Sequence, residues 1–242
     1  MTISAANKVL KLSSRLAAAA SMVAEGTRVA DVGCDHGKLS AWLVLSGRCI
    51  FAYAIDISKP SLQKAADLFV SLNVDRMTET VYADGLKSLK PGDVDEVVIA
   101  GLGCDVISRI IGDAVWLKDR NKHMVLVPGS RHAELRRYIY SEGYEIEKEQ
   151  AVIDSAVCYT VMSVRYCGIN REISHLFSET GMIEGNDSAS AEYIKRVYMR
   201  AKRKAESLQK ARICNSERSA ETAELITSLE AKYKGVVSDA GR

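Results

Sequence analysis

The chain lacks the cysteine pairs that hold a structural metal or build a disulfide framework. It has six cysteines among 242 residues, and no two of them form a Cys-x-x-Cys pair. Their scatter excludes a zinc ribbon and a disulfide-stapled fold, and it predicts reduced thiols and no bound metal. The six are Cys34, Cys49, Cys104, Cys158, Cys167 and Cys214.

Also missing is an apolar run long enough to cross a bilayer. The stretch LAAAASMVA at residues 16–24 is far shorter than the roughly 20 residues that a membrane helix needs. The N-terminal segment has no basic region followed by an apolar run and a cleavage site, so no secretory signal is expected. The net charge of +2 is too small to indicate a partner by itself. We expect a cytoplasmic protein with no membrane contact.

What the sequence does contain, from residue 28 onward, is an alternation of short β-rich runs and longer amphipathic segments. Such alternation predicts an α/β fold with a mostly parallel sheet and helices on both faces. Strands are expected in 28–33, 51–58, 78–86, 94–103 and 123–130, and helices in 38–47, 60–72 and 133–143. The runs 144–154 and 157–168 follow and alternate like an antiparallel pair that ends the sheet.

The composition changes after residue 170, which predicts a domain of residues 1–170 and a second of residues 171–242. A helix is expected from Ala191 to about Arg212, with a break near Asn215 and a second helix to about Tyr233. Two helices with a short break predict a helical hairpin or antiparallel coiled coil. A monomer is expected rather than an obligate oligomer, although a dimerising coiled coil is the competing interpretation of the hairpin.

The first of these two helices is strongly basic. Residues 191–212 hold eight basic and two acidic residues, a net charge of +6 in a nearly neutral protein. The basic residues are Lys195, Arg196, Arg200, Lys202, Arg203, Lys204, Lys210 and Arg212. This pattern fits either a solvated helix face or a contact with a polyanion.

A glycine loop follows the first expected strand, but it lacks the middle glycine of a dinucleotide-binding loop. The loop reads Gly33-Cys34-Asp35-His36-Gly37, so Asp35 stands where a pyrophosphate needs bare backbone. A carboxylate there repels phosphate and favours a cationic ligand such as S-adenosylmethionine. Asp31 can accept a hydrogen bond from the amino group of that ligand. The alternative is that Asp35 only caps the next helix.

Two more acids end the next expected strands. Asp56 is placed to accept hydrogen bonds from the two ribose hydroxyls, and Asp84 is placed to accept one from the exocyclic amine of adenine. Acids at the ends of three consecutive parallel strands line one crevice, which predicts an adenosyl-cofactor site. The expected cofactor-binding residues are Asp31, Gly33, Cys34, Asp35, Gly37, Asp56, Ile57, Asp84, Gly85 and Gly101.

The fourth expected strand lacks the Asn/Asp-Pro-Pro-aromatic motif that often marks methyl transfer to an exocyclic amine. The segment reads Ala100-Gly101-Leu102-Gly103-Cys104-Asp105. This argues against an exocyclic amino target and leaves a ring nitrogen, a carbon or an oxygen. The two glycines indicate either close backbone approach to a ligand or a tight turn into a helix.

Several motifs together resemble the TrmK family of bacterial tRNA (adenine-N1)-methyltransferases, which modify the adenosine at tRNA position 22. They are LSSRLAAAASMV, VADVGCDHGKLSAWLV, ADGL, DEVVIAGLG, LVPGSRHAELRRYIYSEGYEI and the basic helical hairpin. The resemblance implies a Rossmann-like class I methyltransferase domain, a terminal strand hairpin and a coiled-coil domain. Some positions differ from the family pattern: Cys104 replaces a glycine, Asp56 replaces a more usual glutamate, and Gly129 replaces an asparagine. Tyr159 matches the pattern, but the acidic residue that usually follows it is missing.

The family function implied is S-adenosylmethionine-dependent methylation of N1 of an adenosine in tRNA. Asp35 is then the main candidate catalytic residue and His36 a second one, although Asp35 has a cofactor-binding role as its alternative. The expected RNA contacts are Arg15, Arg131, Arg136, Arg200, Arg203 and Lys204. Two alternatives stay open: a class I methyltransferase with another RNA, protein or small-molecule acceptor, and a non-catalytic RNA-binding relative.

Overall fold

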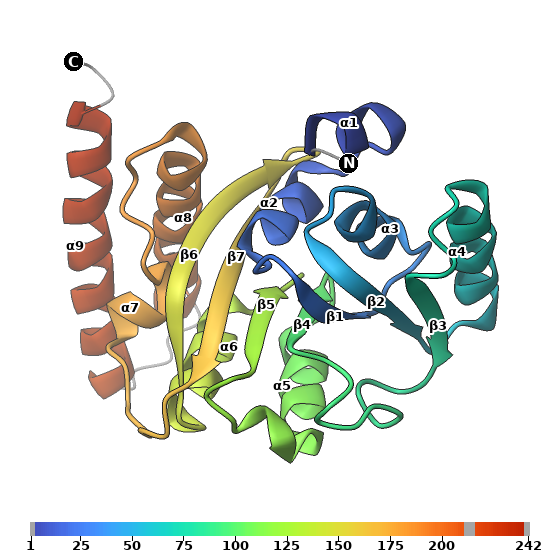
Figure 1. Ribbon diagram of the computed structural model, residues 1–242. Helices are drawn as coiled ribbons and strands as arrows, with labels where there is room; N and C mark the ends of the chain where they lie inside the picture. The colour runs from blue at the N-terminus through green and yellow to red at the C-terminus, as the bar shows by residue number, and fades with distance from the viewer. Residues whose placement is uncertain (1–2, 211–215, 240–242) are drawn as a thin grey trace.

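The computed structural model describes residues 3–210 and 216–239, and within them seven strands form one sheet in the order β3-β2-β1-β4-β5-β7-β6 (Figure 1). The strands are β1 Thr27–Val32, β2 Cys49–Asp56, β3 Thr78–Tyr82, β4 Glu96–Ala100, β5 His123–Val127, β6 Tyr144–Asp154 and β7 Val157–Tyr166. Strands β1 to β5 pair in parallel, whereas β7 runs antiparallel to both β5 and β6. The predicted mostly parallel sheet with a terminal antiparallel hairpin is confirmed.

Helices cover both faces of this sheet, and each face has its own apolar core. The first core joins α1 Ile3–Val9, α2 Ser14–Met22, α3 Lys38–Leu45 and α4 Lys59–Ser71 to the sheet. The second joins α5 Cys104–Asp113, the short 3-10 helix η1 Val115–Leu117 and α6 His132–Ser141 to the opposite face. Helices α1, α2, α5 and, in the C-terminal part, α7 His175–Thr180 were not among the expected elements. Each is ten residues long or shorter, and packing against neighbouring elements stabilises helices of this length. In α5 the buried Ile107, Ile110 and Ile111 do have helical spacing.

The C-terminal part consists of α7 His175–Thr180, α8 Ser188–Lys210 and α9 Ser216–Asp239. Helices α8 and α9 lie side by side, and α8 packs against the β6–β7 hairpin (Figure 1). Their shared core includes Ile194, Val197 and Leu229, and it meets Ala151 and Cys158 of the hairpin. The predicted pair of helices is confirmed, while the expected break at Asn215 and the basic residue Arg212 lie outside the described residues.

The parallel order places the carboxyl ends of β1, β2, β3 and β4 at one edge of the sheet. Asp31 of β1 pairs with Ala54 of β2, and Asp56 pairs with Tyr82 of β3. The loops that follow these strands therefore converge, which is where open α/β sheets bind ligands.

Candidate active site

The glycine loop after β1 is a tight turn that brings the backbone close to neighbouring segments. Gly33 and Gly37 both have positive φ, at 75° and 66°. A Cβ at Gly37 would lie 2.7 Å from the ring of Phe69 and 2.8 Å from Cβ of Ala65, so any side chain there would force α4 away. The loop is held to β2, since the N–H groups of Gly33 and Cys34 both donate to the Ile55 carbonyl.

Asp35 lies at the exposed tip of this loop. Its own φ is positive, at 52°, and its side chain is 76% exposed. The Asp35 backbone N–H donates to the Asp56 carboxylate at 3.1 Å, whereas its carboxylate faces His36 at 3.4 Å. His36 also lies 3.3 Å from the Lys64 amine. The carboxylate of Asp35 is therefore available to a ligand, because the loop uses only its backbone.

Asp56 ends β2 and is oriented by backbone donors. Its Oδ2 accepts from the N–H of Asp35, and its Oδ1 accepts from the N–H of Ser58 at 2.8 Å. The next side chain, Ile57, is 68% exposed. An oriented carboxylate beside an exposed apolar side chain suits a ribose joined to a purine ring.

Asp31 lies beneath the loop and is only 3% exposed. Ser40 of α3 donates to its carboxylate at 2.7 Å. Burial raises the pKa of Asp31, the bonds from Ser40 lower it, and the charge of Asp56 raises it, so that the pKa lies at about 6. The thiol of Cys34 is also buried, and burial raises its pKa. This thiol is therefore protonated and unreactive at neutral pH.

Asp84 and Gly85 follow β3, and the Asp84 carboxylate is already paired with α5. Arg109 donates to both Asp84 oxygens, at 2.8 and 2.9 Å, and Lys87 donates to one of them at 2.9 Å. The bonds from Arg109 and Lys87 hold the pKa of Asp84 well below its usual range. Asp84 is thus a fixed carboxylate, and fewer of its lone pairs are open to an adenine amine than the sequence implied.

Gly101 directly follows β4 and has a φ of 85°. Arg15 of α2 lies directly over it. A Cβ at Gly101 would lie 3.0 Å from Nη1 of Arg15. The Arg15 guanidinium is held by Asp154 and by the ring of Tyr159, two hairpin residues that were not among the predicted site residues. Their signal in the sequence was weak, because both stand at the ends of alternating strands that read as ordinary sheet.

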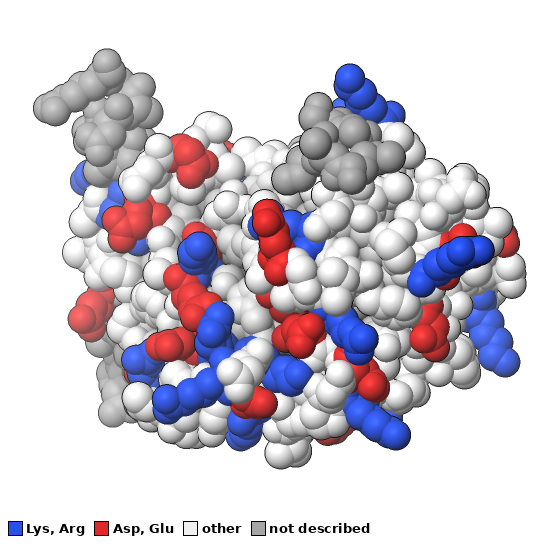
Figure 2. All heavy atoms as spheres, in the orientation of Figure 1, with Lys and Arg blue, Asp and Glu red and all other residues white. Residues whose placement is uncertain are grey.

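Three of the predicted RNA contacts, Arg131, Arg200 and Lys204, line one cavity of about 290 Å³. This cavity lies between α6, α7, α8 and α9. Arg131 pairs with Asp105, and Arg200 pairs with Glu179 at 2.7 Å. Arg203 is exposed on α8 and donates to the Met199 carbonyl. On the face shown in Figure 2, basic and acidic side chains are interspersed and form no single basic field.

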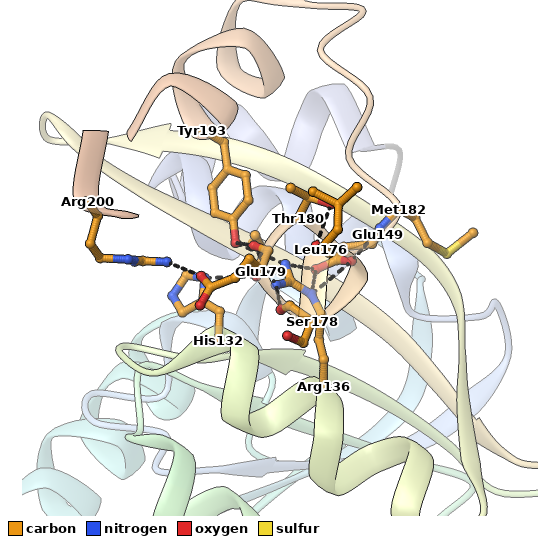
Figure 3. Close-up of polar contacts among 11 residues, drawn as sticks. His132, Arg136, Glu149, Leu176, Ser178, Glu179, Thr180, Met182, Tyr193 and Arg200 are labelled. Atoms are coloured by element: carbon orange, nitrogen blue, oxygen red, sulfur yellow. Dashed lines mark hydrogen bonds and ion pairs between the residues drawn. The ribbon is translucent and has the colours of Figure 1, made fainter. Parts of the chain in front are cut away.

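The prediction that Arg136 contacts RNA is wrong. Its side chain is fully buried and forms an ion pair with Glu149 at 2.6 Å (Figure 3). It also donates to the carbonyls of Ser178 and Glu179 and to the Tyr193 hydroxyl. Burial would lower the pKa of Arg136, but Glu149 outweighs it and raises the pKa. Arg136 lies on the face of α6 that points into the protein. Its guanidinium therefore joins α6 to β6, α7 and α8.

His132, four residues before Arg136 on α6, is half-buried beside this group. Its ring stacks against Tyr193 with centroids 6.1 Å apart (Figure 3). Burial, with the nearby charges of Arg136 and Arg200, lowers the pKa of His132 to about 4. Among the described residues, no cluster of three or more His, Cys, Asp or Glu is arranged to hold a metal, and no helix is long and apolar enough to span a membrane.

A sheet of this order, a terminal antiparallel hairpin and strand-end acids around a glycine loop define a Rossmann-like class I methyltransferase. The family model described as "Methyltransferase domain" matches residues 12–162, and the chain belongs to that family. The match covers the sheet up to the middle of β7, so it includes all of the strand-end acids.

Individual relatives agree with this assignment. The chain is 28% identical over 153 residues to tRNA (adenine(22)-N(1))-methyltransferase of Bacillus subtilis, which covers 63% of this chain and 64% of that enzyme. The chain spans less than two thirds of the length of the curated relatives it matches.

Solved structures share the fold over nearly the whole chain. The tRNA methyltransferase TrmK of B. subtilis matches with a TM-score of 0.80 at 21% identity, covering 93% of this chain and 99% of that one. TrmK of M. capricolum, solved with S-adenosyl-homocysteine, matches with a TM-score of 0.74 at 20% identity, covering 93% and 99%.

Proposed function

We propose that this protein transfers the methyl group of S-adenosylmethionine to N1 of an adenosine in tRNA. The observation that carries the cofactor assignment is the set of acids at the carboxyl edge of the sheet. Asp31 lies below the glycine loop, Asp56 is oriented by two N–H donors, and Ile57 is exposed beside it. A cofactor with an ammonium and a sulfonium but no phosphate fits this acidic loop, whereas a dinucleotide does not.

The acceptor assignment draws on the B. subtilis relative, which is named as an adenine-N1 methyltransferase of tRNA. N1 of adenine carries its lone pair in the ring plane, so no proton has to leave before it attacks the methyl carbon. The protein's main task is then to unstack the base and hold N1 in line with the methyl group. The bound cofactor supplies the electrophilic methyl, and the exposed carboxylate of Asp35 is placed to orient the base or to stabilise the charge that develops on it.

We also propose that the C-terminal part, residues 171–242, holds the body of the tRNA. Arg131, Arg200 and Lys204 line one cavity between α6 and the helices of this part, and Arg203 is exposed on the same helix as Arg200. Cationic side chains of this kind bind phosphates without reading sequence. Arg15 lies apart from this cavity, over Gly101.

The direct test is incubation of the protein with methyl-labelled S-adenosylmethionine and unmodified total tRNA, followed by nucleoside mass spectrometry. The expected product is 1-methyladenosine at one position per accepting tRNA, and an Asp56→Ala variant should bind the cofactor more weakly. Label in another nucleoside would overturn the N1 assignment. Label in protein or small molecules, with none in RNA, would overturn the tRNA assignment.

A further inference from the structure

The guanidinium of Arg15 lies between a carboxylate and an aromatic ring. Its Nε is 3.5 Å from Oδ2 of Asp154, and its Cζ is 5.4 Å from the ring centroid of Tyr159. The Asp154 side chain is 15% exposed and that of Arg15 is 32% exposed, so the pair is largely shielded from water. A carboxylate at the edge and an aromatic face are the two groups that bind a flat, delocalised cation.

Asp154 and Tyr159 lie near the carboxyl ends of the parallel strands, where the methyl acceptor has to lie. Asp154 ends β6 and Tyr159 lies in β7, and both contact the Arg15 guanidinium, whose Nη1 lies over Gly101 directly after β4. Leu102, the next residue, would contact a Cβ on Gly33 at 3.3 Å. The Arg15 guanidinium is therefore beside the crevice between the ends of β1 and β4, where the glycine loop lies.

Methylation of a ring nitrogen creates a planar cation in that crevice. N1 of adenine attacks the methyl carbon, the N–C bond forms, the S–C bond breaks, and the electron pair of that bond stays on sulfur. No proton leaves, so the positive charge passes from the sulfonium to the purine ring. The product base, like a guanidinium, is flat and delocalised and carries an N–H donor on its edge.

We propose that Asp154 and Tyr159 form the subsite for the acceptor base, and that Arg15 occupies this subsite until the base enters. The ring of Tyr159 stacks on the base, and Asp154 accepts from its exocyclic amine. Both groups favour the base more as it gains positive charge, so they stabilise the transition state more than the substrate. This inference rests on the proposed N1 methylation, and it names the residues that hold the base.

Binding of methylated and unmethylated tRNA tests the subsite apart from catalysis. With S-adenosylhomocysteine present, the wild-type protein should bind tRNA carrying 1-methyladenosine roughly 3-fold to 30-fold more tightly than unmodified tRNA. Tyr159→Phe keeps the aromatic face and should keep the preference. Tyr159→Leu and Asp154→Asn should each lose it. Tyr166→Leu, the same change farther along β7, is the matched control and should behave as wild type.

The outcomes separate this inference from the proposed function. If the wild-type protein methylates N1 of adenosine in tRNA but binds the two tRNAs equally, or if Tyr159→Leu and Asp154→Asn keep the preference, the subsite is overturned alone. Thermal unfolding of each variant shows whether the fold is kept, and Tyr159→Phe reports on the aromatic face without loss of packing.

The role of Arg15 has its own measurement, the affinity of the protein for free 1-methyladenosine by calorimetry. Arg15→Ala removes the cation that occupies the subsite, so it should bind the nucleoside several-fold more tightly than wild type. Weaker binding by this variant would overturn the assignment of Arg15 as the occupant.

Discussion

At the scale of single residues, the candidate site depends on how the fold treats its carboxylates. Asp31 is buried, Asp84 is fixed by Arg109 and Lys87, and Asp35 is exposed on a strained turn. Three acids that look alike in the sequence therefore differ in charge state and availability. These differences give each acid its own test.

Cofactor binding should depend on pH through Asp31. The pKa of Asp31 is raised to about 6 in the ligand-free protein, and an ammonium group binds only its ionised form. Affinity should therefore rise with pH through about 6, becoming about tenfold tighter at about pH 7.5 than at about pH 5. Calorimetry at several pH values measures this. Asp31→Asn should bind weakly with a flat profile, and a wild-type slope in that variant would contradict the assignment.

The Asp35→Asn variant should impair methyl transfer more than cofactor binding. Asparagine tolerates the positive φ at this position, and the backbone N–H that bonds Asp56 is kept. The single-turnover rate should fall at least about tenfold, while cofactor affinity stays within about twofold. Both are measured on one preparation, with Asp75→Asn as a surface control. Equal losses in rate and affinity would make Asp35 a cofactor ligand.

At the scale of elements, one buried ion pair joins the C-terminal helices to the methyltransferase sheet. Arg136 of α6 pairs with Glu149 of β6 and donates to the Ser178 and Glu179 carbonyls near the end of α7 (Figure 3). A chain cut near Gly168 would remove those carbonyls and Tyr193 and leave part of the guanidinium without acceptors. The two predicted domains thus share a polar core, and point substitutions are better tests of the C-terminal part than truncation.

Loss of Arg136 should destabilise the protein strongly. Arg136→Met leaves Glu149 buried without its cation, which costs about 3–5 kcal/mol of unfolding free energy. The double variant Arg136→Met with Glu149→Leu should be more stable than the single one, since no unpaired charge remains. Urea unfolding measures both. The exposed pair Lys118–Glu142 is the control, because Lys118→Met should cost no more than about 1 kcal/mol. Equal costs for the buried and exposed pairs would contradict the role of Arg136.

At the scale of the whole molecule, charge is distributed unevenly along a chain whose net charge is only +2. Figure 2 shows mixed signs on one face, whereas α8 concentrates basic residues. A protein that grips a folded RNA needs several phosphate contacts at once, and each contact steepens the dependence of affinity on salt. The basic part of α8 is the segment best placed to supply them.

Reversal of Arg203 and Lys204 to glutamate should weaken tRNA binding and reduce its salt slope by about two. Both residues are exposed, so the fold should be kept. Filter binding across a salt series measures the slope, and sedimentation of the same samples reports the oligomeric state. The matched control reverses Arg76 and Lys90, two exposed basic residues that flank β3 in the chain. An unchanged slope in the α8 variant would make its basic face ordinary solvated surface.

The sequence by itself determined the seven strands, the helices α3, α4 and α6, the C-terminal helix pair and the acids at the strand ends. These follow from local pattern, since side chains repeat every second residue in strands and every 3.6 residues in helices. Only the tertiary structure decided that Arg136 is buried, that Arg109 holds Asp84, and that Arg15 lies on Tyr159 beside Gly101. Each of these contacts joins residues that are separated in the chain. The sequence pattern of a helix is the same whether its arginine is exposed to water or paired with a buried glutamate.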